Sequence, residues 1–123
     1  MTAIKESSTR NANKKIAVLT CPVTYIMNRI GGYWKPIILY QLMQGPKRYS
    51  ELRKAIPPIT EKMLIQHLKQ MEADNLIIRQ AKAVVPPFVI YSLSPSGQEL
   101  QPVLQSMADW AVRDNEKAIN VAV

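Results

Sequence analysis

The feature that most constrains the fold of this chain is an amphipathic segment at residues 61–74. Leu64, Leu68 and Met71 stand at positions i, i+4 and i+7, which is the spacing of one apolar face on an α-helix. Thr60 comes immediately before the segment and is a candidate N-cap, because its hydroxyl can accept a hydrogen bond from the first turn. The pattern therefore predicts a helix that buries one face against a core and leaves the other in solvent.

Two strand-like runs follow this helix. Residues 76–82 and 88–93 are rich in β-branched or aromatic side chains. Asn75, which stands between the helix and the first run, tolerates the left-handed conformation that ends many helices. Pro86 and Pro87 cannot donate ladder hydrogen bonds, so they are expected near the tip between the two strands. The sequence after the amphipathic helix thus predicts a short β-hairpin.

Further helices are predicted on both sides of this unit. Helix start and stop signals give helices at 23–30, 34–43 and 51–55, the last with Ser50 as its N-cap, and a long helix that opens at Ser94 and Pro95 and fades after Lys117. Two helices joined by a tight turn, the second followed by a hairpin, make a winged helix-turn-helix. We therefore expect a mainly α fold with a small β-hairpin (α+β). A flexible basic arm is expected at 1–20 and a single domain at 21–123.

The charge of the chain is distributed unevenly. It carries 16 Lys and Arg against 9 Asp and Glu, and the excess of basic residues lies almost entirely at or before Lys82. A positive excess of this kind favours a polyanionic partner such as nucleic acid. We therefore expect the first two thirds of the chain to bind the anion and the C-terminal end to serve another purpose.

The polar face of the helix at 61–74 suits the major groove of double-stranded DNA. The side chains expected to contact DNA from this helix are Thr60, Lys62, Ile65, Gln66, Lys69 and Gln70. Gln can pair with adenine, Lys can reach guanine or phosphate, Ile can touch a thymine methyl, and Thr beside free amides suits a phosphate. The cations expected on the DNA backbone are Lys47, Arg48, Arg53, Lys54 and Lys82. The alternative is an ordinary solvated helix face.

Several classes of protein are disfavoured. One cysteine, Cys21, and one histidine, His67, cannot form an intrachain disulfide or an all-Cys/His zinc site, and His67 is expected to be a packed residue. No carboxylate pair, glycine-rich phosphate loop or Ser/His/Asp set stands out, so no enzyme activity, metal or cofactor is expected. No run is long and apolar enough to span a bilayer and the first residues do not resemble a signal peptide, so we expect a cytoplasmic protein without a membrane partner.

Most of the chain resembles a known family. The stretch CPVTYIMNRIGGYWKPIILYQLMQGPKRYSELRKAIPPITEKMLIQHLKQMEADNLIIR, followed by PPFVIYSLSPSGQEL and a helix with Trp110, is similar to the HxlR-type family of bacterial transcription regulators. The resemblance runs from Cys21 to about Ala111. It implies a winged-helix regulator of transcription that binds double-stranded DNA as a homodimer on a palindromic operator. It points to no particular small-molecule effector.

Members of this family pair through their first and last helices. The resemblance therefore implies a C-terminal dimerisation helix at 95–118 and an interface made by Val23, Ile26, Ile30, Leu100, Val103, Leu104, Met107 and Trp110. The residues agree, because the last helix has an apolar stripe and little basic charge. Two-fold symmetry would bring two recognition helices to half-sites roughly 34 Å apart, one turn of DNA. A monomer with the last helix folded back on the core is the alternative.

Two features leave the function open. Cys21 matches a cysteine that senses quinones, aldehydes or oxidants in some relatives, so the resemblance makes it a candidate sensor. An inert, partly buried thiol is the alternative. Phe88 and Ile90 stand where the family often has charged residues, which leaves the hairpin little beyond Lys82 to hold phosphate. A winged-helix adaptor that binds protein or RNA without sequence-specific DNA binding is therefore kept as the second function.

Overall fold

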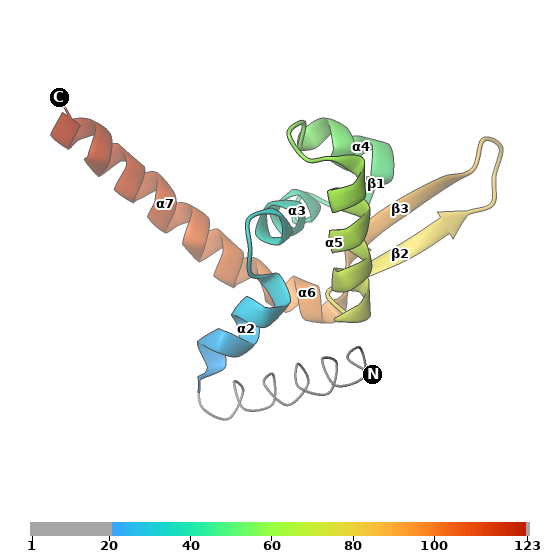
Figure 1. Ribbon diagram of the computed structural model, residues 1–123, viewed down its shortest axis with the longest axis horizontal. Helices are drawn as coiled ribbons and strands as arrows, with labels where there is room; N and C mark the ends of the chain where they lie inside the picture. The colour runs from blue at the N-terminus through green and yellow to red at the C-terminus, as the bar shows by residue number, and fades with distance from the viewer. Residues whose placement is uncertain (1–20, 123) are drawn as a thin grey trace, which may run out of the picture.

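The computed structural model describes residues 21–122, so the arm predicted at 1–20 lies outside the described residues. The elements are α2 (Pro22–Ile30), α3 (Trp34–Leu42), β1 (Lys47–Arg48), α4 (Tyr49–Ala55), α5 (Glu61–Ala73), β2 (Ile77–Lys82), β3 (Phe88–Leu93), α6 (Pro95–Glu99) and α7 (Gln101–Ala122). In Figure 1 the β2–β3 hairpin extends to one side of the central helices, and α2 and α7 extend to the other. This is a winged helix-turn-helix, as the sequence predicts.

The core lies between α3, α4 and α5. Ile38 of α3 and Leu52 of α4 are fully buried, and so are Leu64, Leu68 and Met71 of α5, none of them more than 1% exposed. The apolar stripe predicted on α5 is therefore confirmed. Because this stripe faces α3, the rotation of α5 about its axis is fixed and its polar face is turned outward.

The sheet has three antiparallel strands in the order β1, β3, β2. The predicted hairpin is confirmed, since β2 and β3 pair along their full lengths. A strand that the sequence analysis missed is β1, in which Lys47 lies opposite Tyr91 and Arg48 lies opposite Ile90. A strand of two residues has no pattern of its own, because it exists only through pairing with β3. β1 brings two of the predicted DNA-backbone cations to the edge of the sheet, beside β3. The hairpin of β2 and β3 is the wing of the fold.

The start of α4 differs from the prediction. The helix begins at Tyr49, and its N-cap position is Arg48 rather than Ser50. The backbone N–H of Arg48 donates to the Glu51 carboxylate over 2.8 Å. Glu51, the third residue of the helix, therefore accepts from the backbone of the N-cap residue, as in one half of a capping box.

The predicted last helix is two helices. Ser94 caps α6 as expected, since its Oγ accepts from the N–H of Gly97 at 3.0 Å. The helix is then interrupted at Leu100, and α7 starts immediately after it. Pro102 explains the break, because proline lacks the N–H that would bond to the preceding turn and its ring crowds that turn.

A small polar junction joins the end of α5 to α6. Asn75 has the left-handed conformation expected of it, with φ 58°. Its carbonyl accepts from the Ser94 hydroxyl at 2.6 Å, and the carbonyl of Leu76 accepts from the Ser94 N–H at 3.0 Å. Ser94 itself is fully buried. The C-terminal end of α5 is thus fastened to the base from which α7 departs.

The two terminal helices project from the domain. Figure 1 shows α2 and α7 leaving the body on the side away from the wing tip. Within residues 21–122 no helix combines the length and apolar character that crossing a membrane requires.

Candidate nucleic-acid interface

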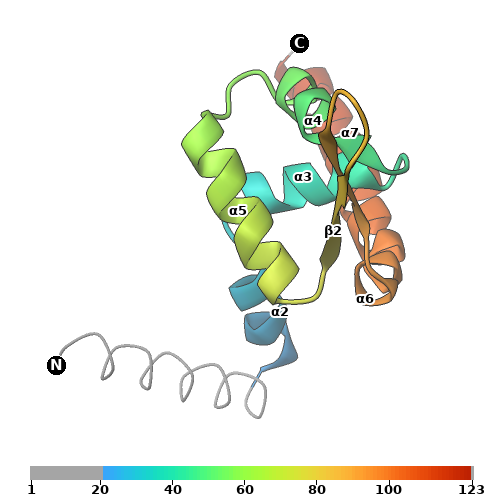
Figure 2. The ribbon, with the colours of Figure 1, turned by 90° about the vertical axis from the view of Figure 1, so that its right-hand side faces the viewer.

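The outward face of α5 is polar and accessible. Lys62, Gln66 and Lys69 are exposed, and Ile65 beside them is 39% exposed. Gln70 is partly buried, so it lies at the margin of this face. In Figure 2 α5 lies next to the hairpin with nothing in front of it. The helix therefore presents amide and ammonium groups on a convex surface that fits a major groove.

The start of α5 is capped as predicted. The Thr60 hydroxyl accepts from the N–H of Met63 over 3.2 Å. Thr60 remains exposed, and so does Glu61 in the first turn. The cap uses one of the free N–H groups of the first turn and leaves the Thr60 side chain at the surface.

The predicted DNA-backbone cations fall into two groups. Arg48, Lys54 and the partly buried Lys47 and Lys82 lie around α4 and the wing. The Arg48 guanidinium stacks on the Phe88 ring, 3.8 Å from its centroid, which holds it against the wing. These four residues form a positively charged rim beside the polar face of α5.

Arg53 is the second group of predicted DNA-backbone cations, and it forms an ion pair within the chain. Its Nη1 lies 3.5 Å from a carboxylate oxygen of Glu61, so it ties α4 to the first turn of α5. The pair is solvent-exposed and contributes little stability. Arg53 is thus partly engaged within the chain before any DNA phosphate arrives.

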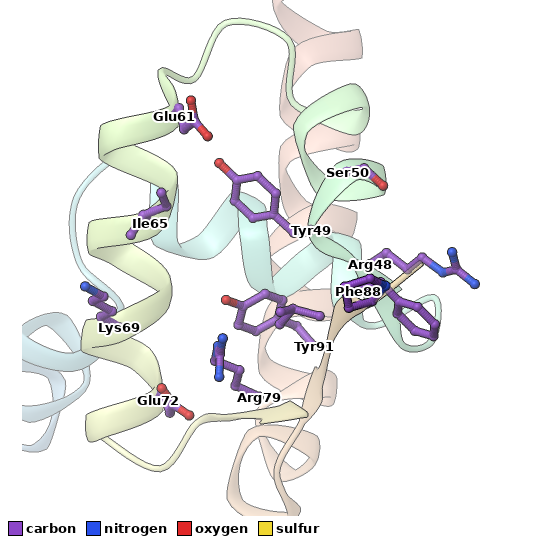
Figure 3. Close-up of a pocket in the computed structure, with 12 residues that line it drawn as sticks. Arg48, Tyr49, Ser50, Glu61, Ile65, Lys69, Glu72, Arg79, Phe88 and Tyr91 are labelled. Carbon is purple, nitrogen blue, oxygen red and sulfur yellow. The ribbon is translucent and has the colours of Figure 1, made fainter. Parts of the chain in front are cut away.

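Between α5, the start of α4 and the wing lies a cleft of about 700 Å³. Its walls include Ile65, Lys69 and Glu72 of α5 and Arg79 and Tyr91 of the sheet. Figure 3 shows the Arg79 guanidinium beside the Tyr91 hydroxyl, both turned toward α5. Burial raises the pKa of Tyr91, and Arg79 opposes this rise by a hydrogen bond to the hydroxyl.

Arg79 is the functional candidate that sequence reasoning missed. It is exposed on β2, directly opposite Tyr91 of β3. Directly paired residues of an antiparallel sheet point to the same face, so the register turns Arg79 into the cleft. The available signal was the period of two along residues 77–82, combined with the presence of Tyr91 on the facing strand.

His67 lies on the flank of the buried stripe, as predicted, and is only partly exposed. Both ring nitrogens are shielded from solvent. Burial, followed by the nearby positive charge of Lys35, lowers the pKa of His67 below its ordinary value. Among the described residues no group of three or more His, Cys, Asp or Glu side chains is placed to hold a metal ion.

The residues predicted at a dimer interface divide into two sets. Val23, Val103, Met107 and Trp110 are 42–64% exposed, so they form an uncovered apolar surface on α2 and α7. Ile26 and Leu100 are partly buried against the core. Ile30 and Leu104 need correction, because at 3% and 4% exposure they are core residues of the single chain. The uncovered surface is therefore narrower than the sequence suggested.

Cys21 occupies the N-cap position of α2 and is partly exposed. The Thr24 hydroxyl, followed by the backbone N–H groups of Thr24 and Val23, stabilises the thiolate and lowers the pKa of Cys21. The cause of the lowered pKa is therefore the start of the helix. At the other end of α2, Arg29 lies 3.5 Å from the Asp74 carboxylate at the end of α5. One helix thus carries the thiol and touches the end of α5.

Comparison with known proteins agrees with this geometry. The family described as HxlR-like helix-turn-helix matches residues 29–118. The HTH-type transcriptional regulator YdeP of Bacillus subtilis (strain 168) is 43% identical over 97 residues, which cover 79% of this chain and 76% of YdeP.

Two solved structures are also similar to this chain. The redox regulator HypR in its oxidised form has a TM-score of 0.72 at 40% identity, covering 76% of this chain and 96% of HypR. The reduced transcriptional regulator YodB from B. subtilis has a TM-score of 0.67 at 37% identity, covering 74% and 89%.

Proposed function

The chain belongs to the HxlR-like helix-turn-helix family and is a transcriptional regulator, and from this premise we propose that it binds a palindromic operator in double-stranded DNA as a homodimer. In this proposal α5 is the recognition helix. Its exposed Lys62, Gln66 and Lys69 read base edges in the major groove. Thr60 and the cations around α4 and the wing hold the phosphates on either side.

The observation that carries this proposal is the outward face of α5. The face is polar and basic, the helix behind it is locked by its buried stripe, and a rim of cations flanks it on β1 and α4. A rigid helix with amide and ammonium groups can discriminate base pairs, whereas a mobile one would lose that selectivity. An ordinary solvated helix face explains the polarity of α5 but not the cations beside it.

The homodimer is supported by the uncovered surface on α2 and α7. Val23, Met107 and Trp110 are each more than half exposed, and side chains of this type are rarely left in solvent together without a partner. A two-fold axis through this surface leaves both recognition helices free, since α5 and the wing lie on the other side of the domain (Figure 1).

We further propose that Cys21 controls DNA binding by reaction with an electrophile or oxidant. Its thiol has a lowered pKa and lies on a helix of the proposed dimer surface. Two relatives in the comparison, HypR and YodB, were studied in defined redox states. The chain has one cysteine, so any disulfide would join two molecules, whereas a quinone would add to the thiolate directly.

Selection from a random duplex library at near-physiological salt tests the proposal. Reduced protein should recover a two-fold symmetric motif, and quinone-treated protein should lose it while the Cys21→Ser variant keeps it under the same treatment. Loss of the motif in both treated proteins would exclude Cys21 as the sensor. Recovery of no motif by reduced wild-type protein would contradict sequence-specific DNA binding.

An adaptor function is the second candidate, favoured by the uncharged tip of the hairpin. Val84 and Val85 are 52% and 99% exposed there, and exposed apolar side chains suit a protein partner better than a phosphate. This candidate predicts weak DNA binding that has no sequence preference and disappears as salt is raised. The same selection experiment therefore separates the two functions.

A further inference from the structure

The positive charges of the wing lie on its strands and not at its tip. The loop between β2 and β3 consists of Ala83, Val84, Val85, Pro86 and Pro87, none of which is charged. Val85 at this tip is 99% exposed, so no charged side chain of the described residues covers it. Any electrostatic contact that the hairpin makes with DNA must therefore come from the strands.

Arg79 is the strand cation that is turned toward α5. It lies opposite Tyr91, and Figure 3 shows its guanidinium at the Tyr91 hydroxyl on the wall of the cleft that faces α5. The Tyr91 hydroxyl beside it occupies only part of the donors of the guanidinium. A planar guanidinium held in this way is suited to bidentate contact with a phosphate.

The carboxylates that line the cleft do not neutralise Arg79 in direct contact. Ion pairs within 4.0 Å in the described part of the chain are Arg29–Asp74 and Arg53–Glu61. Glu61, at one end of the cleft, is thus already paired, while Glu72 makes no ion pair at that distance with Arg79. Figure 3 shows the Arg48 guanidinium turned away from α5 beside Phe88 and the Lys69 ammonium on the outer side of α5, so Arg79 is the cation that an anion entering the cleft would meet.

The position of the cleft identifies the anion. When a recognition helix occupies the major groove, the strand that borders that groove passes along the side of the helix, between it and the wing. We propose that the cleft between α5 and the wing receives a backbone phosphate of this strand, that Arg79 is its anchor, and that the wing tip contributes no affinity. This inference rests on the proposed function, since it assumes that α5 enters the major groove.

The test combines variants of Arg79 with single neutral phosphates in the selected duplex. Replacing phosphates one at a time by methylphosphonate should reveal a position beside the α5 contact where wild-type binding weakens by about 10-fold. At that position the Arg79→Gln variant should lose almost nothing further, because its charge is already absent. The Arg79→Gln variant should also reduce the salt slope of binding by about one.

Three matched variants separate contact from structure. Gln80→Ala, on the opposite face of the same strand, and Val85→Ser, at the tip, should leave affinity and salt slope unchanged. Arg79→Lys should keep most of the salt slope and show a smaller loss at that one phosphate, since Lys retains the charge but lacks the planar fork. Thermal unfolding of each variant shows whether the fold is intact, and if Arg79→Gln does not fold, Arg79→Lys alone decides through the methylphosphonate scan.

Two results would overturn the inference. One is an Arg79→Gln variant that folds, binds with the wild-type salt slope and responds to every methylphosphonate as the wild type does. The other is a loss of affinity in Val85→Ser as large as that in Arg79→Gln. Absence of any preferred sequence in the wild type would sink the proposed function instead, and the salt slopes on a random-sequence duplex would still decide the phosphate site.

Discussion

At the scale of single residues, Gln66 on α5 and Arg48 on β1 offer DNA different chemistry. The exposed Gln66 amide can donate to and accept from one base edge, so it can distinguish one base pair from another. The Arg48 guanidinium, stacked on Phe88, offers charge that any phosphate satisfies equally. The two residues should therefore fail in different ways when they are removed.

The Gln66→Ala variant should relax the preferred sequence at one base pair in each half-site. The loss of a bidentate contact is worth about 1–3 kcal/mol of discrimination at that position. Repeating the duplex selection with the variant measures this loss of discrimination.

Arg48→Ala should retain the preferred sequence and lower the salt slope by about one. Gln98→Ala removes an exposed amide from α6 and is the control for Gln66→Ala, so it should change neither the preferred sequence nor the salt slope. A Gln66→Ala motif identical to that of the wild type would show that α5 reads DNA through another face.

His67 should make the stability of the fold depend on pH. Burial and the Lys35 charge lower the pKa of His67 in the folded state. In the unfolded chain the pKa of His67 has its ordinary value near 6.5, so below that pH the unfolded chain binds the proton more readily than the folded one. The stability that comes from neutral His67 is complete above pH 6.5 and is lost as the pH falls through the folded-state pKa. Melting temperatures between pH 7 and pH 5 should fall less for His67→Gln than for the wild type. Parallel curves for the two proteins would contradict this.

At the scale of elements, α6 is a short helix that connects the sheet to α7 and packs near the end of α5. Gly97 is buried there, and a Cβ at this position would overlap the carbonyl oxygen of Leu76, just before β2. The close approach lets Ser94 bond to both Asn75 and Gly97. The relative placement of α5, the wing and α7 therefore depends on one small residue.

Gly97→Ala should destabilise the protein by about 1–3 kcal/mol, because overlap with a backbone atom forces the helix or the strand to shift. Chemical denaturation measures the change. Ser96→Ala, at the exposed neighbouring position, is the matched control and should stay within about 0.5 kcal/mol of the wild type. Equal stability of the two variants would show that α6 can move without cost.

Local patterns predicted most elements, and non-local pairing accounts for what was missed. The stripe of α5, its Thr60 cap and the bounds of β3 could be predicted because each depends on neighbouring residues. β1 could not, since two residues become a strand only when β3 lies beside them. Arg79 was overlooked for the same reason, because its direction follows from the register with Tyr91. The break at Leu100 had a local signal in Pro102, which the continuous apolar stripe obscured.

At the scale of the whole molecule, the domain has two sides of different character. One side carries α5, the wing and the cations, and the other carries the uncovered apolar surface of α2 and α7. Arg29 and Asp74 lie between these sides and join the end of α2 to the end of α5. A change at the proposed dimer surface therefore has a direct structural route to α5, the proposed recognition helix.

Met107→Glu should convert the protein to a monomer and weaken operator binding by about 10²-fold or more. A buried, unpaired carboxylate opposes association, and a monomer loses the second half-site. Light scattering gives the mass and anisotropy gives the affinity. Val112→Glu is the matched control, since Val112 is 59% exposed and lies roughly 140° around α7 from Met107. If Met107→Glu remains a dimer, the proposed interface is wrong.

The central claim is that α5 reads a specific sequence, and the most direct measurement is an affinity ratio. The dissociation constants of reduced wild-type protein should be compared for its selected duplex and for a scrambled duplex of the same composition, at near-physiological salt. The account predicts that the selected duplex binds about 10³-fold more tightly or better. A ratio near one, with both affinities falling together as salt rises, would mean that the basic face attracts DNA without reading it.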